Sequence, residues 1–421
     1  MYQKVKGTQD FVGIDAKKLR FIETNIRTVI EKYGFEEIIT PIFENTEVFV
    51  RSSGEDSDIV SKEMYTFLDK GNRSLTLRPE GTAAVVRCFL ENKLYAQRSL
   101  NKYYYFGPMF RYERPQAGRF REFHQFGIET FGTSSPYLDA DVIISASEIF
   151  KALGINNIKL KINTIGDFAS RAAYAKLLKE YFGANISSLC SDCARRLEKN
   201  PLRILDCKVD RENPLLKNAP KIDSVLSPES KAYFQHVLEI LDASGINYEI
   251  DSNLVRGLDY YTDTVFEYIL DSDDELNGLA ICAGGKYSDL VRSFNGPDIP
   301  GIGYAFGIER IIAIMDKENL FPDFRSGADI VLISLDEKSK EKALLMAKDL
   351  RKAGFYAELD YVNFNLKPQF KLSDQVSAKY LLIIGEEERK NKIYTIKNNL
   401  TKEQVSVSEA KIIEFFKEKL K

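Results

Sequence analysis

The sequence has no apolar run of membrane-spanning length, and its first residues, MYQKVKGTQDF, lack the apolar segment of a secretion signal. We therefore expect a cytoplasmic protein with no membrane partner. Cysteine is scarce, and five cysteines in 421 residues predict free thiols rather than a disulfide framework. The chain also has two histidines and no Walker-type loop, which disfavours Ser-His or Cys-His catalysis and a P-loop nucleotide site.

The composition is that of a globular protein with more than one domain. Hydrophobic residues make up 44% and charged residues 29% of the chain, and 421 residues are enough for two or three domains. The net charge of −3 is uneven, because residues 326–421 carry +3 and the remainder carries −6. This weakly basic C-terminal part is compatible with nucleic-acid contact but does not establish it.

The most informative stretch is FGPMFRYERPQAGRFREFHQFGIE at residues 106–129. It reads as two extended segments joined by a loop, and side chains alternate between the two faces of a strand. One face is expected to present Gly107, Met109, Arg111, Glu113, Arg121, Phe123, Gln125, Gly127 and Glu129. Phe126 and Ile128 fall on the opposite face as core, and His124 falls there as well.

The residue types on the first face indicate a binding site. Arginines beside an aromatic ring suit a nucleoside polyphosphate, because guanidinium groups match phosphate oxygens and a ring can stack on a base. Carboxylates and an amide suit a cationic, hydrogen-bonding small molecule. The alternative is a salt-bridged surface hairpin. We favour the site, because surface hairpins rarely keep such different groups on one face.

Two segments nearer the N-terminus predict helices and strands. Apolar residues three or four apart predict a helix over 15–33 that ends at Gly34. Residues 35–43 read as one extended segment, which Pro41 restricts to a sheet edge or a subunit boundary.

Residues 75–90 read as a strand, a turn and a helix that opens near Thr82. Glu80 and Thr82 then lie at a strand-to-helix junction, where polar groups often face a pocket. The alternative is that Thr82 is an ordinary helix cap.

The remaining segments suggest an insertion and a second domain. Residues 167–225 show helical patterns with three cysteines, one fewer than the four ligands of structural zinc, so we expect free thiols and no metal. Residues 253–310 read as strand-rich, and GIGYAFG within them lacks the spacing of a dinucleotide loop. Alternating strands and helices from residue 327 predict a separate α/β domain after a linker at 324–329.

Several of these segments closely resemble the class II aminoacyl-tRNA synthetases, in the form found in histidyl-tRNA synthetases. The matching segments are residues 110–125 (motif 2), 78–82 (amino-acid-binding segment), 254–261 (the LVRGLDYY signature) and 301–310 (motif 3). The resemblance spans essentially the whole chain. It implies an α+β catalytic domain at 1–325, built on an antiparallel sheet flanked by helices, with a helical insertion at about 167–225. An α/β anticodon-binding domain follows at 327–421.

The resemblance also implies the function. The enzyme is expected to activate histidine with ATP and Mg²⁺, to transfer it to histidine tRNA for protein synthesis, and to be a homodimer. The implied catalytic residues are Arg256, Arg111 and Arg310. The implied ATP-binding residues are Arg111, Glu113, Arg119, Phe123 and Arg310. The implied histidine-binding residues are Glu80, Gly81, Thr82, Arg111, Gln125, Glu129, Arg256, Tyr260 and Tyr261.

One departure from the family pattern is GGKYSD at 284–289, where the family usually shows Arg-Tyr-Asp-Gly, so that Lys286 keeps the charge but not the guanidinium fork. Two alternatives remain. One is a catalytically silent paralogue that regulates histidine biosynthesis, against which Arg111, Arg256, Arg310 and the last domain argue. The other is a synthetase for threonine, proline or glycine, against which LVRGLDYY argues.

Overall fold

The computed structural model describes residues 2–54, 57, 59–115, 118–256, 260–273, 276–325 and 327–420. The chain divides into two compact units, Met1–Phe321 and Pro322–Lys421. Part of the LVRGLDYY signature, at 257–259, lies outside the described residues, as do residues 116–117 of the motif 2 stretch. The domain boundaries drawn from the sequence stay predictions.

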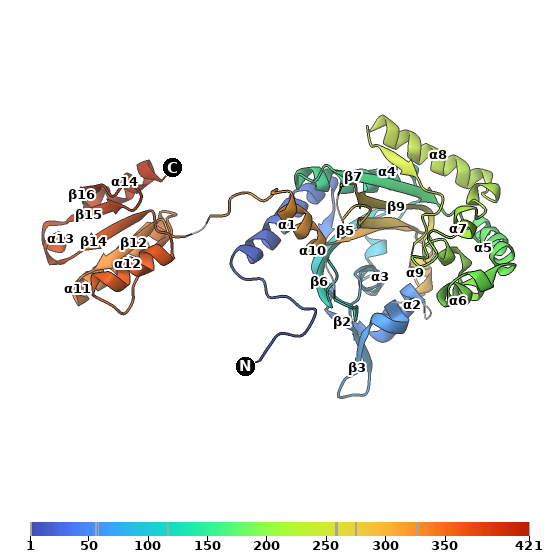
Figure 1. The fold of residues 1–421 in the computed structure, drawn as a ribbon, viewed down its shortest axis with the longest axis horizontal. Helices are drawn as coiled ribbons and strands as arrows, with labels where there is room; N and C mark the ends of the chain where they lie inside the picture. The colour runs from blue at the N-terminus through green and yellow to red at the C-terminus, as the bar shows by residue number, and fades with distance from the viewer. Residues whose placement is uncertain are drawn as a thin grey trace. The chain divides into compact units, whose positions relative to one another are not determined.

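An eight-stranded sheet forms the centre of the first unit, in the order β1-β5-β6-β11-β10-β9-β7-β8 (Figure 1). Its strands are β1 (Glu36–Glu37), β5 (Asn101–Phe110), β6 (Glu122–Phe131), β7 (Ile158–Thr164), β8 (Tyr248–Ile250), β9 (Thr262–Leu270), β10 (Ala280–Tyr287) and β11 (Gly301–Gly307). All neighbours from β5 to β7 pair antiparallel, whereas the edge strands β1 and β8 pair parallel. The predicted antiparallel α+β architecture is confirmed.

Four helices pack against this sheet and against each other around the largest core: α1 (Ile14–Ile30), α4 (Pro136–Ala152), α8 (Pro228–Ala243) and α10 (Ile308–Lys317). Phe126 and Ile128 of β6 are fully buried in this core, as the alternation pattern predicts. The predicted first helix is confirmed: α1 runs into a 3₁₀ turn at Glu31–Tyr33 and stops at Gly34, whose φ of 78° favours glycine.

The extended segment at 35–43 is not a single edge strand. Strand β1 lies at the edge of the large sheet, but β2 (Phe43–Asn45) joins a three-stranded sheet with β4 (Ser74–Leu77) and β3 (Tyr65–Leu68). Both β1 and β2 lie at the edge of a sheet, as Pro41 predicts, but they belong to two different sheets rather than to one extended segment. Pro41 lies between the two strands and cannot donate a ladder hydrogen bond, which explains the break. Helix α2 (Thr46–Ser53) and a π-helical turn (Ile59–Glu63) connect β2 to β3.

A second core joins other side chains of the sheet to further helices. These are α3 (Thr82–Glu91), a 3₁₀ turn (Leu94–Ala96) and α9 (Leu290–Ser293). Between β7 and α8 the chain forms α5 (Phe168–Gly183), α6 (Ser191–Lys199), α7 (Pro214–Lys217) and 3₁₀ turns at Ile186–Ser188, Pro201–Ile204 and Ile222–Ser224. They lie beside the sheet (Figure 1). The helical character predicted for 167–225 is confirmed.

The second unit is a five-stranded mixed sheet with helices, as predicted, in the order β13-β12-β14-β15-β16. Its elements are β12 (Ile330–Ser334), α11 (Glu337–Lys352), β13 (Ala357–Leu359), α12 (Leu366–Gln375), β14 (Tyr380–Ile384), α13 (Glu386–Asn391), β15 (Ile393–Asn398), β16 (Gln404–Ser408), a 3₁₀ turn (Glu409–Lys411) and α14 (Ile412–Lys419). The sequence pattern missed α13 and β16. In the described parts of both units, every helix is too short or too polar to span a bilayer.

Candidate active site

A cavity of about 310 Å³ lies on the large sheet, over β6, β10 and β11. All the predicted site residues except Gly81 line it: Glu80, Thr82, Arg111, Glu113, Arg119, Phe123, Gln125, Glu129, Arg256, Tyr260, Tyr261 and Arg310. The fold thus brings together side chains from distant parts of the sequence into one pocket.

Glu129 is a buried carboxyl group held by two hydroxyl groups. Thr82 Oγ1 donates to its Oε1 at 2.6 Å, and the Tyr287 hydroxyl donates to its Oε2 at 2.5 Å. Burial raises the pKa of Glu129 to about 8, and the nearby charge of Glu80 raises it as well. The hydrogen bonds from the two hydroxyl groups act in the opposite direction and lower it. At neutral pH this site therefore favours a protonated carboxyl group unless a cationic partner binds it.

Glu80, not Thr82, caps helix α3. Its carboxylate accepts hydrogen bonds from the backbone N–H groups of Thr82 at 2.6 Å and Ala83 at 3.0 Å. The alternative that Thr82 is the cap is wrong, because its hydroxyl donates to Glu129 instead. Burial raises the pKa of Glu80, although these N–H donors oppose the rise. Two carboxyl groups therefore share one end of the cavity.

Tyr105 is a cavity residue that the sequence pattern missed. A Cβ atom at Gly81 would lie 2.3 Å from its ring, and one at Gly127 would lie 2.3 Å from its hydroxyl. Both glycines therefore make room for Tyr105. Its hydroxyl lies 3.5 Å from Gln125 Oε1. Extending the alternation two residues upstream of Gly107 would have placed Tyr105 on this face.

Tyrosines also form part of the wall. The Tyr260 ring lies 4.6 Å from that of Tyr261 and 5.6 Å from that of Tyr287, between centroids. Tyr287 follows Lys286 in β10 and reaches Glu129, a contact that single-strand alternation could not reveal. The carboxyl groups are thus enclosed by phenol rings and hydroxyl groups.

Arginines gather in another part of the cavity. Arg111 Nε donates to the Pro79 carbonyl oxygen at 2.8 Å, and its guanidinium lies 5.4 Å from the centroid of the Phe123 ring. Arg310 Nη1 donates to the Ala280 carbonyl oxygen at 2.7 Å. Burial lowers the pKa of Arg310, and the charges of Arg119 and Arg111 lower it further. Neighbouring guanidinium groups that repel one another suit a polyanionic ligand.

Arg121 does not join these arginines, and the prediction that it does is wrong. Its guanidinium lies 4.2 Å from the centroid of the Tyr112 ring, and it is not among the residues that line the cavity. The reason is that β5 ends at Phe110 and β6 begins at Glu122, so strand alternation does not extend to Arg121. Arg111 and Glu113 also lie beyond the strand, but in a loop that still reaches the cavity.

Arg256 is partly buried and forms an ion pair with Glu267 of β9, another cavity residue that the sequence pattern missed. It lies in irregular chain before β9, so the strand-rich reading of 253–310 does not hold at this residue. Burial works to lower its pKa, but Glu267, Tyr261 and Tyr260 outweigh burial and the pKa is raised. Arg256 therefore stays cationic at the cavity, 5.7 Å from the centroid of the Tyr261 ring.

His124 lies on the far side of β6 from Phe123 and Gln125, as predicted. Its backbone N–H donates to the Glu309 carboxylate at 2.8 Å, and its ring Nδ1 lies 3.0 Å from the same oxygen. The ring packs edge-on to Phe11. His124 is not among the residues that line the cavity.

Lys286, the departure from the family pattern, is buried away from the cavity. Its Nζ donates to Ser134 Oγ at 2.5 Å, pairs with Asp263 at 3.2 Å and lies 4.1 Å from the centroid of the Tyr233 ring. Lys286 is not among the residues that line the cavity, so its side chain does not form part of the pocket wall.

The antiparallel sheet, with arginines and carboxyl groups around one cavity, is the architecture expected of a class II aminoacyl-tRNA synthetase. The family model described as histidyl-tRNA synthetase matches residues 7–311, and the model described as anticodon binding domain matches residues 329–419. The chain belongs to the histidyl-tRNA synthetase family.

Individual relatives agree over the full length. The chain is 47% identical over 408 residues to a histidine–tRNA ligase of Anoxybacillus flavithermus, covering 97% of this chain and 96% of the relative. It is 45% identical over 420 residues to that of a Geobacillus species, covering 100% and 99%. The crystal structure of apo histidyl-tRNA synthetase from S. aureus matches with a TM-score of 0.84 and 38% identity, covering 99% and 100%.

Proposed function

We propose that the protein is a histidine–tRNA ligase. It activates L-histidine with ATP to give histidyl-adenylate and pyrophosphate, and it transfers histidine to the 3′ end of histidine tRNA in cytoplasmic protein synthesis. Full-length relatives with this name and nearly half of their residues in common support the proposal. The observation that carries it is a single cavity lined by several guanidinium groups together with the buried carboxyl groups of Glu80 and Glu129.

The arginine part of the cavity binds ATP. Arg111 and Arg310 hold the phosphates with Arg119, while Glu113 and Phe123 hold the adenine. ATP enters as its magnesium complex, so that Mg²⁺ arrives with the substrate. Adenylate formation is an in-line attack of an ionised carboxylate on the α-phosphorus, which needs positioning and charge neutralisation rather than a general base. The lining of this cavity supplies cations for that step.

The carboxyl part of the cavity binds histidine. Glu80, Thr82 and Gln125 hold the α-amino end, and Glu129 and Tyr261 read the imidazole, with Tyr260 in the wall. Imidazole offers one donor and one acceptor when neutral and two donors when charged. An apolar amino acid would exclude water from Glu129 and Tyr261 without offering either of them a hydrogen bond, and this mismatch costs heavily in free energy.

Arg256 positions the two reacting groups. It is the cation expected to touch both the histidine carboxylate and the α-phosphate. Its ion pair with Glu267 and its burial fix the guanidinium before substrates arrive. Since Arg111, Arg256 and Arg310 line the same cavity, the chain retains the cations that a silent paralogue often loses.

The active protein is a homodimer. Apolar side chains are exposed around Pro41 and on the three-stranded sheet: Ile39, Ile42, Phe43, Phe67 and Leu68. Exposed apolar residues of this kind favour a protein interface, and the sequence already restricts the segment around Pro41 to a sheet edge or a subunit boundary. Sedimentation at micromolar concentration tests this, with a monomer as the contrary result.

The C-terminal unit binds the anticodon of the tRNA, and the helices at 167–225 face its acceptor stem. The test of the whole proposal is charging of total tRNA with radiolabelled histidine in the presence of ATP. Histidine should be incorporated, and labelled threonine, proline and glycine should not. Incorporation of threonine, proline or glycine instead of histidine, or no incorporation of any of the four, would refute the proposal.

A further inference from the structure

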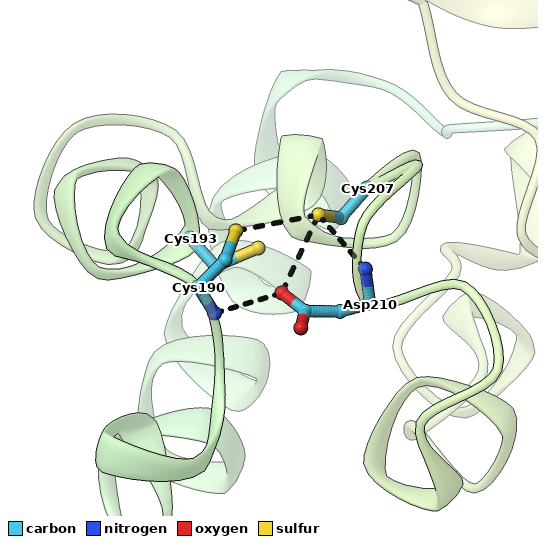
Figure 2. A group of neighbouring side chains, drawn as sticks. All are labelled: Cys190, Cys193, Cys207 and Asp210. Carbon is cyan, nitrogen blue, oxygen red and sulfur yellow. Dashed lines mark hydrogen bonds between the residues drawn. The ribbon is translucent and has the colours of Figure 1, made fainter.

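Four side chains of the helical segment between β7 and α8 form a compact cluster, the Cys/Asp cluster: Cys190, Cys193, Cys207 and Asp210 (Figure 2). One ligand atom from each, a thiol sulfur or a carboxylate oxygen, lies within 4.8 Å of all the others. Cys193 and Cys207 are buried, and all the cysteines are free thiols. The cluster lies in a different part of the unit from the cavity, since none of its members lines it.

Local structure brings the four groups together. Cys190 directly precedes α6 and Cys193 lies in its first turn, so one helix start presents two sulfur atoms. Cys207 and Asp210 lie in the turn after the 3₁₀ helix at Pro201–Ile204. The Asp210 N–H donates to Cys207 Sγ at 3.4 Å, and the Cys190 N–H donates to Asp210 Oδ2 at 2.9 Å. These backbone bonds fix the two turns against each other.

The distances fit a tetrahedral zinc ion. With Zn–S near 2.3 Å, two ligand sulfurs of a tetrahedron lie about 3.8 Å apart, and a sulfur and a carboxylate oxygen lie about 3.5 Å apart. The Cys190 and Cys207 sulfurs are 3.6 Å apart, and Cys207 Sγ is 3.4 Å from Asp210 Oδ2. The Cys190–Cys207 and Cys207–Asp210 pairs therefore already have the separation that two ligands of one zinc ion require.

We propose that the Cys/Asp cluster is a structural Zn²⁺ site. Three thiolates select a soft or borderline ion such as Zn²⁺ over Mg²⁺ or Ca²⁺, and Asp210 closes the fourth position. Each thiol releases its proton to solvent when its sulfur binds the ion. The count of three cysteines argued against a metal in the sequence. A count of cysteines alone omits the fourth ligand, which is Asp210, three residues after Cys207.

The ion would link a part of the fold that has little regular structure of its own. Between α6 and α7 the chain contains one short 3₁₀ helix and a stretch without helix or strand at 205–213. A bond from Cys207 and Asp210 to the start of α6 would fasten this stretch directly. Such a site contributes to folding stability rather than to chemistry.

Two other states of the cluster are possible outcomes. The first is a disulfide between Cys190 and Cys207, whose sulfurs are 3.6 Å apart here, well beyond the bonded distance of about 2.05 Å. The second is a set of hydrogen-bonded thiols without an ion. Metal content, cobalt absorption and thiol mass distinguish all three.

The experiment uses the full-length, tag-free protein, purified without chelator from medium that contains zinc. Metal content is measured by mass spectrometry for wild type, C193S, C207S and D210N. C88S is the matched control, because Cys88 is also a free cysteine but lies in α3, outside the cluster. Wild type and C88S should retain about one zinc per chain after dialysis, and C193S and C207S should lose at least tenfold in affinity, as ligand removal does. D210N should bind more weakly than wild type.

Cobalt substitution keeps the proposal testable if a cysteine variant fails to fold. Co²⁺ added to metal-free wild type should give the intense thiolate-to-cobalt and d–d absorption of a tetrahedral site, and Zn²⁺ should displace it. Three results would overturn the proposal: wild type that binds neither ion, unchanged zinc in folded C193S and C207S, or an intact mass two hydrogens lower, from a disulfide. Zinc content does not depend on tRNA charging, so failure here leaves the proposed function standing.

Discussion

Replacing Glu129 by glutamine should stabilise the ligand-free protein at alkaline pH and abolish histidine activation. Glu129 is buried, and burial raises its pKa to about 8. A neutral amide of the same shape removes the cost of ionising this group. The Thr82 hydroxyl still finds an oxygen, and the Tyr287 hydroxyl can accept from the new NH₂ group. The variant therefore separates the charge of Glu129 from its shape.

The size and sign of the effect follow from linkage. A pKa raised from 4.5 to about 8 means that the folded protein binds more protons than the unfolded chain between these values. Wild-type stability should therefore fall as pH rises through this window and level off above it. Between pH 5 and pH 8 the ionisation cost grows by about 3.5 kcal/mol as an upper limit, at about 1.4 kcal/mol for each pKa unit.

Urea unfolding of wild type and E129Q at pH 5, 6, 7 and 8 measures the difference. Circular dichroism is the suitable probe, because the chain has no tryptophan. The stability advantage of E129Q should increase with pH, while its histidine-dependent pyrophosphate exchange is lost at every pH. An advantage that is independent of pH would mean that Glu129 is already ionised in the ligand-free site, and the assignment of its pKa would be refuted.

Three further predictions concern the division of roles. R256A should lower the rate of histidine-dependent pyrophosphate exchange by far more than tenfold, while circular dichroism shows that the protein is folded. A tenfold loss of rate corresponds to about 1.4 kcal/mol of activation free energy. A rate within tenfold of wild type would mean that Arg256 does not take part in the reaction. H124N should exchange near normally, because His124 contacts Glu309 from outside the cavity lining, and a loss of several orders of magnitude in a folded variant would contradict this. Removal of residues 327–421 should leave exchange detectable in the remaining protein but cripple tRNA charging, and equal losses in both assays would show that this unit supports the cavity directly.

Residues close in sequence could be placed well from periodicity alone. Strand alternation correctly assigned Phe126 and Ile128 to the core and Gln125 and Glu129 to the cavity, because both strands are regular there. The same rule failed for Arg121, which lies outside β6. Alternation holds only while the ladder of hydrogen bonds keeps the backbone extended.

Contacts between distant segments could not be obtained in this way. The Glu129–Tyr287 and Arg256–Glu267 pairs join strands and loops that are far apart in the sequence. A single sequence does not show which residues of such segments lie opposite each other. The Cys/Asp cluster shows the same limit, since its fourth candidate ligand becomes evident only when two turns meet in space. Among the arginines of the cavity, Arg111 was indicated by alternation, whereas Arg119, Arg256 and Arg310 were located by resemblance to the family.

The most direct test of the account is ATP–pyrophosphate exchange by the full-length protein with each of the twenty amino acids in turn. The account predicts exchange with histidine and background levels with the others, because only an imidazole offers the hydrogen bonds that the proposed Glu129 and Tyr261 pocket is built to make. Exchange that depends on a different amino acid, or no exchange with histidine by a folded protein, would contradict it.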